Sequence, residues 1–379
     1  MTTPADIAVY GSGITAHTTA LLMADMGLRV QVSASLSAQS TTDIRAYAMN
    51  HASRSTLTAS GVWPASGEAA WLTPIDHMRV FGDGAGQLLL DSQRDQPVAW
   101  MADVAALEAL LAQKVGAHSR IDHCPAGQEP VGTLSVLCEG KHSAWRAKLG
   151  IDTQPVVYPH RALAARLQLP EPHGGVAQQW FDGDTILALL PVGGANGREL
   201  AMVWSMAQTA CNDWVAQAHS DAGVKALAHA IQLASHHTFK DIQLIGRPVA
   251  FDLVLSRATQ WVRPGVALVG DSAHTIHPLA GLGLNMGLAD VQALVNVVAA
   301  RRRGQSVSDM RLLRRYQRVR ATNTLSLQWA THGLFHLFTQ PWAKAQPVQG
   351  LRNWGMLAVN AAKPLKAWIQ AQGMGRAET

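Results

Sequence analysis

One carboxylate and the loop that follows it have the residue types and spacing for cofactor chemistry. Asp271 comes directly after the apolar run 266–269 and its glycine, and Gly281 and Gly283 follow within the next twelve residues. A carboxylate here can accept hydrogen bonds from sugar-alcohol hydroxyls, whereas it would repel a phosphate. The glycines let backbone N–H groups approach a flat ring, and the helix predicted from Leu284 points its positive end at that ring. The stretch predicts a site for a polyhydroxyl chain and a ring that carries negative charge.

Two histidines in the same loop, His274 and His277, have the spacing H-x-x-H. This spacing can indicate a metal site, but no third ligand lies nearby in the sequence. We therefore expect no metal here, and we assign neither histidine as a catalytic base.

A second glycine turn lies near the N-terminus, between a predicted strand and a predicted helix. Gly11, Gly13 and Ala16 form the pattern G-x-G-x-x-A. Gly11 permits a tight turn, Gly13 lets the backbone approach a pyrophosphate, and Ala16 allows the helix to pack closely on the strand. The next predicted strand ends at Ser33, where such sites normally place an acid for the ribose hydroxyls. The pattern favours a dinucleotide site, and a turn that serves only packing is the alternative.

The residues from 264 to 287 closely resemble the flavin-binding signature of the class A FAD-dependent monooxygenases, in the form typical of the ubiquinone-biosynthesis hydroxylase family. The resemblance rests on Gly270-Asp271, on Ala-His-x-x-His-Pro-Leu-Ala-Gly and on Gly-Leu-Asn. The family's flavin-adjacent arginine matches Arg45, for which a surface role is the alternative. The resemblance implies FAD as the cofactor, bound in this segment by Asp271, Pro278, Gly281, Gly283, Leu284 and Asn285.

The resemblance also implies an activity. NADPH or NADH would reduce FAD, O2 would add to form a flavin hydroperoxide, and the distal oxygen would hydroxylate the ring of a polyprenylated phenol in ubiquinone biosynthesis. No side chain need act as a nucleophile, so no catalytic residue is assigned. Pro278 and the backbone from 281 to 283 would shape the reaction face.

The chain departs from the family pattern mainly on the adenosine and pyrophosphate side. Besides Ser33, Glu139 stands where an aspartate is usual, and the helix near Val104 lacks an expected arginine. Leu282, in the flavin loop, replaces a common glutamine. Two alternatives therefore stay open: a class A hydroxylase of a soluble aromatic compound, and a non-catalytic flavin-fold scaffold subunit that has lost FAD.

The expected fold class is α/β, with an FAD-binding Rossmann-like domain, an inserted antiparallel β-sheet substrate domain and a helical C-terminus. A βαβ opening, alternating apolar and polar residues from 156 to 205, and predicted helices over 44–61, 212–238 and 309–338 support it. We assign the FAD-binding domain to 1–70, 101–155 and 259–305, the substrate domain to 71–100 and 156–258, and the helical C-terminal region to 306–379.

Composition bears on partners and location. The chain is 48% hydrophobic and 15% charged, where about 25% charged is ordinary, which indicates apolar surface for a partner, a greasy ligand or a bilayer. No run reaches the roughly 18 apolar residues of a spanning helix, and no signal peptide is evident. Three widely spaced cysteines fit a reducing compartment. We expect a cytoplasmic protein, with peripheral association at the inner membrane face or with a ubiquinone-synthesising complex as an option.

The formal charge is +5, and the arginines gather in one region. Residues 301–303 are all arginine, and the helix predicted after them carries five more. A solvated helix face is the simpler interpretation, and a patch for anionic lipid or an acidic partner is the alternative. Nucleic acid is not expected, because no recognised reading motif accompanies these arginines. The five are Arg311, Arg314, Arg315, Arg318 and Arg320.

Overall fold

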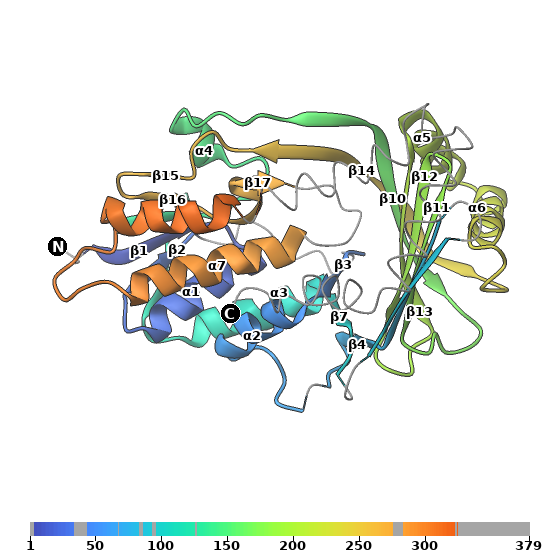
Figure 1. The fold of residues 1–379 in the computed structure, drawn as a ribbon, viewed down its shortest axis with the longest axis horizontal. Helices are drawn as coiled ribbons and strands as arrows, with labels where there is room; N and C mark the ends of the chain where they lie inside the picture. The colour runs from blue at the N-terminus through green and yellow to red at the C-terminus, as the bar shows by residue number, and fades with distance from the viewer. Residues whose placement is uncertain are drawn as a thin grey trace.

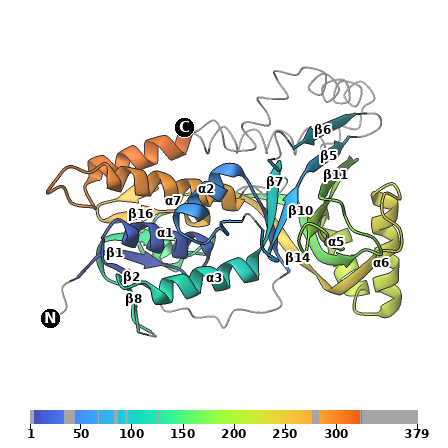
Figure 2. The same ribbon diagram turned by 90° about the horizontal axis from the view of Figure 1, so that it is seen from below.

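The computed structural model describes residues 4–33, 44–66, 68–82, 86–92, 96–125, 127–275, 283–322 and 324. Two large sheets lie side by side, with a small three-stranded sheet between them (Figure 1). The long strands β10 (Val156–Gln168) and β14 (Gln243–Arg257) reach from the middle of the molecule into the second large sheet, which Figure 2 shows from below. The fold class expected from the sequence is confirmed for the described residues.

The first sheet has six strands in the order β15-β16-β9-β1-β2-β8. All neighbours pair in parallel except β15 and β16, which pair antiparallel. Its central strands are short, apolar and buried, as expected for a parallel sheet covered on both faces. The strands are β1 (Ala5–Tyr10), β2 (Val30–Val32), β8 (Ile121–His123), β9 (Gly132–Leu137), β15 (Val262–Arg263) and β16 (Val266–Leu268).

Three helices pack together beside this sheet. Helix α1 (Ile14–Asp25) contacts both α3 (Val104–Ala117) and α7 (Gly283–Ala299). A further helix over residues 310–322, dark orange in Figure 1, lies alongside α7. The N-terminal ends of α1 and α7 therefore meet near the carboxyl ends of the parallel strands, which is where α/β sheets bind ligands.

The second sheet has eight strands in the order β17-β14-β10-β13-β12-β11-β5-β6, all antiparallel except the pair β11 and β5. Helices α5 (Gln208–Gln217) and α6 (Asp221–Ala234) cover one face of it and share a buried apolar core with its strands. The other strands are β5 (His77–Phe81), β6 (Gln87–Asp91), β11 (Val176–Asp182), β12 (Thr185–Val192), β13 (Glu199–Ala207) and β17 (His274–Thr275).

The small sheet, in the order β3-β7-β4, joins the two large ones. It consists of β3 (Ala46–Met49), β7 (Ala99–Asp103) and β4 (Leu72–Ile75), and helix α2 (His51–Ala59) follows β3 directly. The remaining short elements are α4 (Ala144–Lys148) and the 3-10 turn η1 (Gly270–Ser272).

Two predicted helices differ from the structure. The stretch 44–61 is not one helix, because residues 46–49 pair with β7 and α2 begins only after Asn50, whose side chain accepts from Ser53 N at 2.8 Å. The stretch 212–238 is two helices, because Ser220 caps a new one by accepting from Gly223 N at 3.1 Å. Of the stretch 309–338, residues 310–322 are helical and those from 325 onward lie outside the described residues.

The assignment of chain segments to domains stays a prediction. Within the described ranges, no helix combines the length and apolar character needed to cross a bilayer.

Candidate functional site

A cavity of about 570 Å³ lies at the carboxyl edge of the six-stranded sheet. Residues that follow β1, β2, β9 and β16 form its floor, and α3, β3 and the first turns of α1 and α7 form its walls. The cavity thus extends between the two glycine-containing segments that the sequence singles out. Its lining includes Gly11, Gly13, Thr15, Ser33, Arg45, Glu108, Glu139, Asp271, Gly283 and Leu284.

At one end, the chain turns tightly into α1. Gly11 has a φ of +118°, and a Cβ there would lie 2.4 Å from the carbonyl oxygen of Cys138. Gly13 caps the helix without a side-chain acceptor, and the first turn contains no acid. The backbone N–H groups of this helix end can therefore bind an anion. A Cβ on Gly13 would reach only Glu108, at 3.8 Å, whereas Ala16 of α1 is fully buried in the apolar core that the helix shares with the sheet.

The same end has Ser33 at the position of the usual ribose-binding acid, and two glutamates, Glu108 and Glu139, are among its lining residues. The hydroxyl of Ser33 turns back on the strand, where it donates to Val9 O at 3.3 Å and accepts from Gly11 N at 3.4 Å. Glu139 accepts from Ser143 Oγ and from a backbone N–H of α4. Glu108 lines the opposite wall from α3. A Cβ on Gly13 would lie 3.8 Å from Glu108 Oε1, so the Glu108 carboxylate would repel a diphosphate placed at Gly13.

At the other end, Asp271 stands in the turn η1 with its side chain open to the cavity. Burial by the surrounding protein raises the pKa of Asp271, and the neighbouring charges of His274 and Lys141 oppose that rise. The turn itself needs Gly270, which has a φ of +62°. An acceptor carboxylate at this position suits donated hydroxyl groups.

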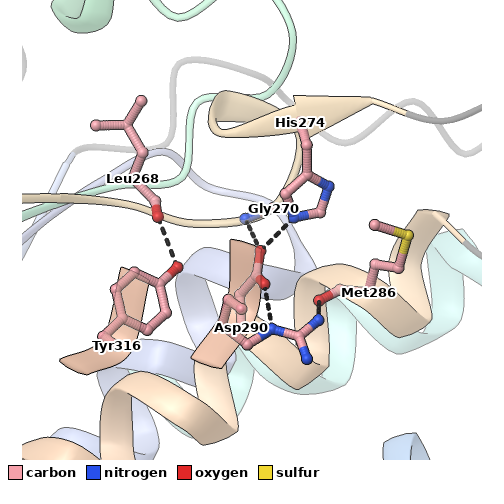
Figure 3. Close-up of polar contacts among 7 residues, drawn as sticks. Leu268, Gly270, His274, Met286, Asp290 and Tyr316 are labelled. Carbon is pink, nitrogen blue, oxygen red and sulfur yellow. Dashed lines mark hydrogen bonds and ion pairs between the residues drawn. The ribbon is translucent and has the colours of Figure 1, made fainter. Parts of the chain in front are cut away.

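A buried ionic network lies directly beneath this turn (Figure 3). Asp290 of α7 is fully buried, and its Oδ2 accepts from Gly270 N at 2.9 Å and lies 2.7 Å from His274 Nε2. Its Oδ1 accepts from Arg320 Nε at 2.7 Å. Tyr316, one turn before Arg320, donates to Leu268 O at 2.7 Å. Two helices therefore hold both the strand end and the turn that present Asp271.

The charges of this network determine its protonation state. Burial alone would raise the pKa of Asp290, but the charges and hydrogen bonds of His274 and Arg320 hold it below its usual range. Asp290 is therefore ionised, and it keeps the buried Arg320 compensated.

Most predicted cofactor residues in the described part of the chain meet in the cavity, with two exceptions. Ala16 lies behind the lining, and the Asn285 amide is used within the protein. Asn285 Oδ1 accepts from Ser53 Oγ at 2.6 Å and from Asn50 N at 3.0 Å, and its Nδ2 donates to Ala48 O at 2.6 Å. Asn285 thus fastens the start of α7 to β3 and α2. Pro278, Gly281 and His277 lie outside the described residues.

One predicted surface residue is in fact buried. Arg320 was grouped with the basic helix face, but it is 3% exposed and pairs with Asp290. It follows Leu313 and Tyr316 on the apolar side of the helix, at a spacing that could have revealed it. The burial of Asp290 could have been predicted in the same way, because this residue lies on the apolar side of α7 among its buried residues.

The lining fits FAD. The helix end at Gly13 provides donors for a diphosphate, and Asp271 provides an acceptor for ribityl hydroxyls. Among the described residues, a Cβ at Gly283 would meet no atom within 4 Å, so these residues leave space beside Gly283. Residues 89–326 match the family model described as FAD binding domain. The chain belongs to that family.

Curated relatives refine the assignment within this FAD-binding family. The chain is 28% identical to 3-demethoxyubiquinol 3-hydroxylase of Escherichia coli K12, over 98% of this chain and 99% of that protein. It is 29% identical to ubiquinone hydroxylase UbiL of Rhodospirillum rubrum, over 98% and 90%. The expected membership of the ubiquinone-biosynthesis hydroxylases is confirmed, and so is the enzyme class, a flavin-dependent aromatic monooxygenase.

Solved structures agree on the fold. The p-nitrophenol 4-monooxygenase PnpA from Pseudomonas putida DLL-E4 matches with a TM-score of 0.78 at 18% identity, over 98% of each chain. PqsL from Pseudomonas aeruginosa, a probable FAD-dependent monooxygenase, matches with a TM-score of 0.73 at 18% identity, over 94% of this chain and 100% of its own.

Proposed function

We propose that this monooxygenase hydroxylates the aromatic ring of a polyprenylated phenol in ubiquinone biosynthesis, with NADPH or NADH as reductant and O2 as co-substrate. The observation that carries the proposal is the near full-length match to 3-demethoxyubiquinol 3-hydroxylase, together with a single cavity that holds the Gly13 helix end and Asp271. FAD supplies the redox and oxygen-transfer chemistry when it is bound.

The chain's own residues bind and orient in this proposal. Gly13 and the first turn of α1 bind the diphosphate, Asp271 accepts from the ribityl hydroxyls, and Arg45 lies beside the flavin. The start of α7, at Gly283 and Leu284, places the positive end of its dipole at the ring, where negative charge develops on reduction. Pro278 and Gly281 complete the reaction face in this proposal. No step needs a protein nucleophile.

The experiment is an oxygen-labelling assay with the purified holoenzyme. With NADH or NADPH and 18O2, a prenylated phenol should gain one labelled oxygen atom, and its unprenylated analogue should react far more slowly. Equal turnover of the two phenols would instead support a hydroxylase of soluble aromatic compounds. A protein without flavin absorption bands that also fails to bind added FAD would contradict the enzyme and support the scaffold alternative.

We also propose a cytoplasmic location with peripheral association at an anionic membrane. Four arginines of the helix over 310–322 are exposed on its outer side, and each contributes about 1 kcal/mol near an anionic surface. Co-sedimentation with phosphatidylglycerol vesicles should fall as salt rises, and it should be absent with phosphatidylcholine alone. Binding that ignores salt and lipid charge would refute this part of the proposal. The four are Arg311, Arg314, Arg315 and Arg318.

A further inference from the structure

One arginine of the eight-stranded sheet reaches across to the walls of the FAD cavity. Arg166 of β10 is 8% exposed. Its Nε donates to Ile44 O at 2.9 Å, and its Nη2 donates to Arg45 O at 3.2 Å and to Asp103 Oδ2 at 2.9 Å. Two of these three acceptors are the backbone carbonyls at and just before Arg45. The guanidinium therefore holds the chain where Arg45 enters the cavity wall.

The same guanidinium is connected to a second wall. Asp103 Oδ1 caps α3 by accepting from Ala106 N at 3.2 Å, while its Oδ2 pairs with Arg166. Val104 N donates to Arg45 O at 3.3 Å. The Arg45 carbonyl oxygen therefore accepts two hydrogen bonds, one from the Arg166 guanidinium and one from the first N–H of α3. Val104 and Glu108 of α3 line the cavity wall near the start of α1. Arg166 thus fixes the spacing between two walls that come from distant parts of the chain.

The local strand geometry favours this reach. The pairing of β10 with β14 is irregular between Ala164 and Arg166, whereas the pairing with β13 continues through Arg166 and Ala201. Such irregularities re-aim side chains and are common next to active sites. The planar guanidinium of Arg166 bonds two carbonyls and a carboxylate from separate nitrogens in a fixed fork, whereas a lysine has all its donors on one nitrogen.

Arg45 has an electrostatic effect inside the cavity. Its side chain lines the cavity, and its charge is one of those that oppose the rise in the pKa of Asp271. The backbone that carries Arg45 is held by the sheet expected to cover the substrate. A change in that sheet would therefore move a charge at the flavin.

We propose that Arg166 is a positioning residue, through which the substrate sheet fixes the Arg45 backbone and aims the Arg45 side chain at the FAD. The proposal rests on the assignment of Arg45 to the flavin, made above. It links the eight-stranded sheet to the small sheet and, through the Asp103 cap, to α3, and it gives substrate binding a route to the cofactor.

The test compares Arg166→Gln and Arg166→Lys with Arg161→Gln as a matched control. Arg161 lies on the same strand but pairs with Asp252, whose side chain is 63% exposed. Arg166→Gln should weaken FAD binding, measured by flavin fluorescence, by roughly tenfold and shift the visible spectrum of bound flavin. Arg166→Lys keeps one charge near Asp103 and should recover part of both effects. Arg161→Gln should change neither.

Trypsin gives a readout that does not depend on the cofactor. Arg166→Gln should expose the peptide bond after Arg45, so that mass spectrometry detects a new cleavage there in the protein without FAD, and Arg161→Gln should not. FAD affinity and spectrum equal to wild type in Arg166→Gln would overturn the proposal, even if thermal stability falls. If Arg166→Gln fails to fold, Arg166→Lys decides by the same measurements.

Arg45→Gln tests the assignment of Arg45 to the flavin separately from the positioning role of Arg166. If Arg45→Gln leaves the FAD affinity and spectrum unchanged, the assignment of Arg45 to the flavin fails, and this inference fails with it while the hydroxylase activity stands. If Arg45→Gln alters both and Arg166→Gln alters neither, only the positioning role of Arg166 is refuted.

Discussion

The two ends of the FAD cavity are built differently. At the Asp271 end, a buried carboxylate, Asp290, compensates Arg320 and holds the turn through Gly270 N. At the Gly13 end, the backbone offers N–H groups but the nearby side chains include Glu108 and Glu139. The first end is preorganised by charges that lie beneath the turn. The second would bind an anion beside the Glu108 carboxylate, while the Glu139 carboxylate is bonded to Ser143 and α4.

This difference indicates which end secures the cofactor. Preorganised donors and acceptors retain their geometry without ligand, whereas like charges near a diphosphate lower its affinity. We therefore expect the ribityl and ring end to contribute most to FAD binding, and the adenosine end to limit it. Four predictions test this contrast.

The largest effect is expected for Asp290→Asn. The substitution keeps the shape but leaves Arg320 as an uncompensated buried charge, so the free energy of unfolding should fall by about 3–5 kcal/mol. Urea denaturation measures this change. Asp213→Asn, an exposed helical aspartate of α5, is the control and should leave the urea midpoint unchanged. A loss as small as that of the control would show that the network does not stabilise the Asp271 end.

Substitutions at the two glycines of the first turn should separate folding from binding. Gly11→Ala forces a Cβ against Cys138 O at a positive φ and should cost about 3 kcal/mol of stability. In Gly13→Ala the new Cβ contacts only Glu108, so the free energy of unfolding should fall by about 1 kcal/mol or less. The same Cβ would stand where the backbone approaches the diphosphate, so FAD binding should weaken more than about tenfold. Thermal unfolding and FAD titration of both variants measure this. Unchanged FAD affinity in Gly13→Ala would argue against a diphosphate at this helix end.

The pH dependence of FAD binding should report on Asp271. Its raised pKa means that the folded protein without cofactor binds more protons than the unfolded chain, so the contribution of Asp271 to stability is lost as pH rises through that pKa. Hydroxyl donors favour the ionised form, so FAD should bind more tightly as pH rises through the same window, by up to about tenfold per pH unit. Titrations across acidic pH measure it, and Asp271→Asn should be flat there. A wild-type profile as flat as that of Asp271→Asn would exclude a hydroxyl-accepting role.

The smallest effect should come from Glu108→Gln. Removing one negative charge from the wall near Gly13 should tighten FAD binding by about threefold to fivefold at low salt, and the gain should shrink as salt screens it. Glu129→Gln is the control, because Glu129 pairs with Lys148 on the surface and is not part of the cavity lining. Weaker binding in Glu108→Gln would mean that this carboxylate assists the ligand, and the contrast between the two ends would be lost.

The sequence predicts those parts of the site that are local. The turn at Gly11 and the loop at Gly270 can be recognised in the sequence, because in each case an apolar strand and the glycine after it are contiguous in the chain. The contacts that support them join residues far apart in the chain, as Arg166 does with Ile44 and Arg320 with Asp290. No short pattern encodes such pairs. The predicted helix over 44–61 failed for the same reason, because pairing with β7 overrides the local preference of residues 46–49.

The contact between Arg320 and Asp290 also orders events during synthesis. The ribosome adds Asp290 to the chain 30 residues before Arg320. At roughly 5–20 residues per second, those 30 residues take about 1.5–6 s, during which Asp290 is made but its arginine is still missing. A chain halted before residue 320 lacks the compensating charge for that carboxylate, so we expect the Gly270 turn to reach its binding geometry only after Arg320 has been made.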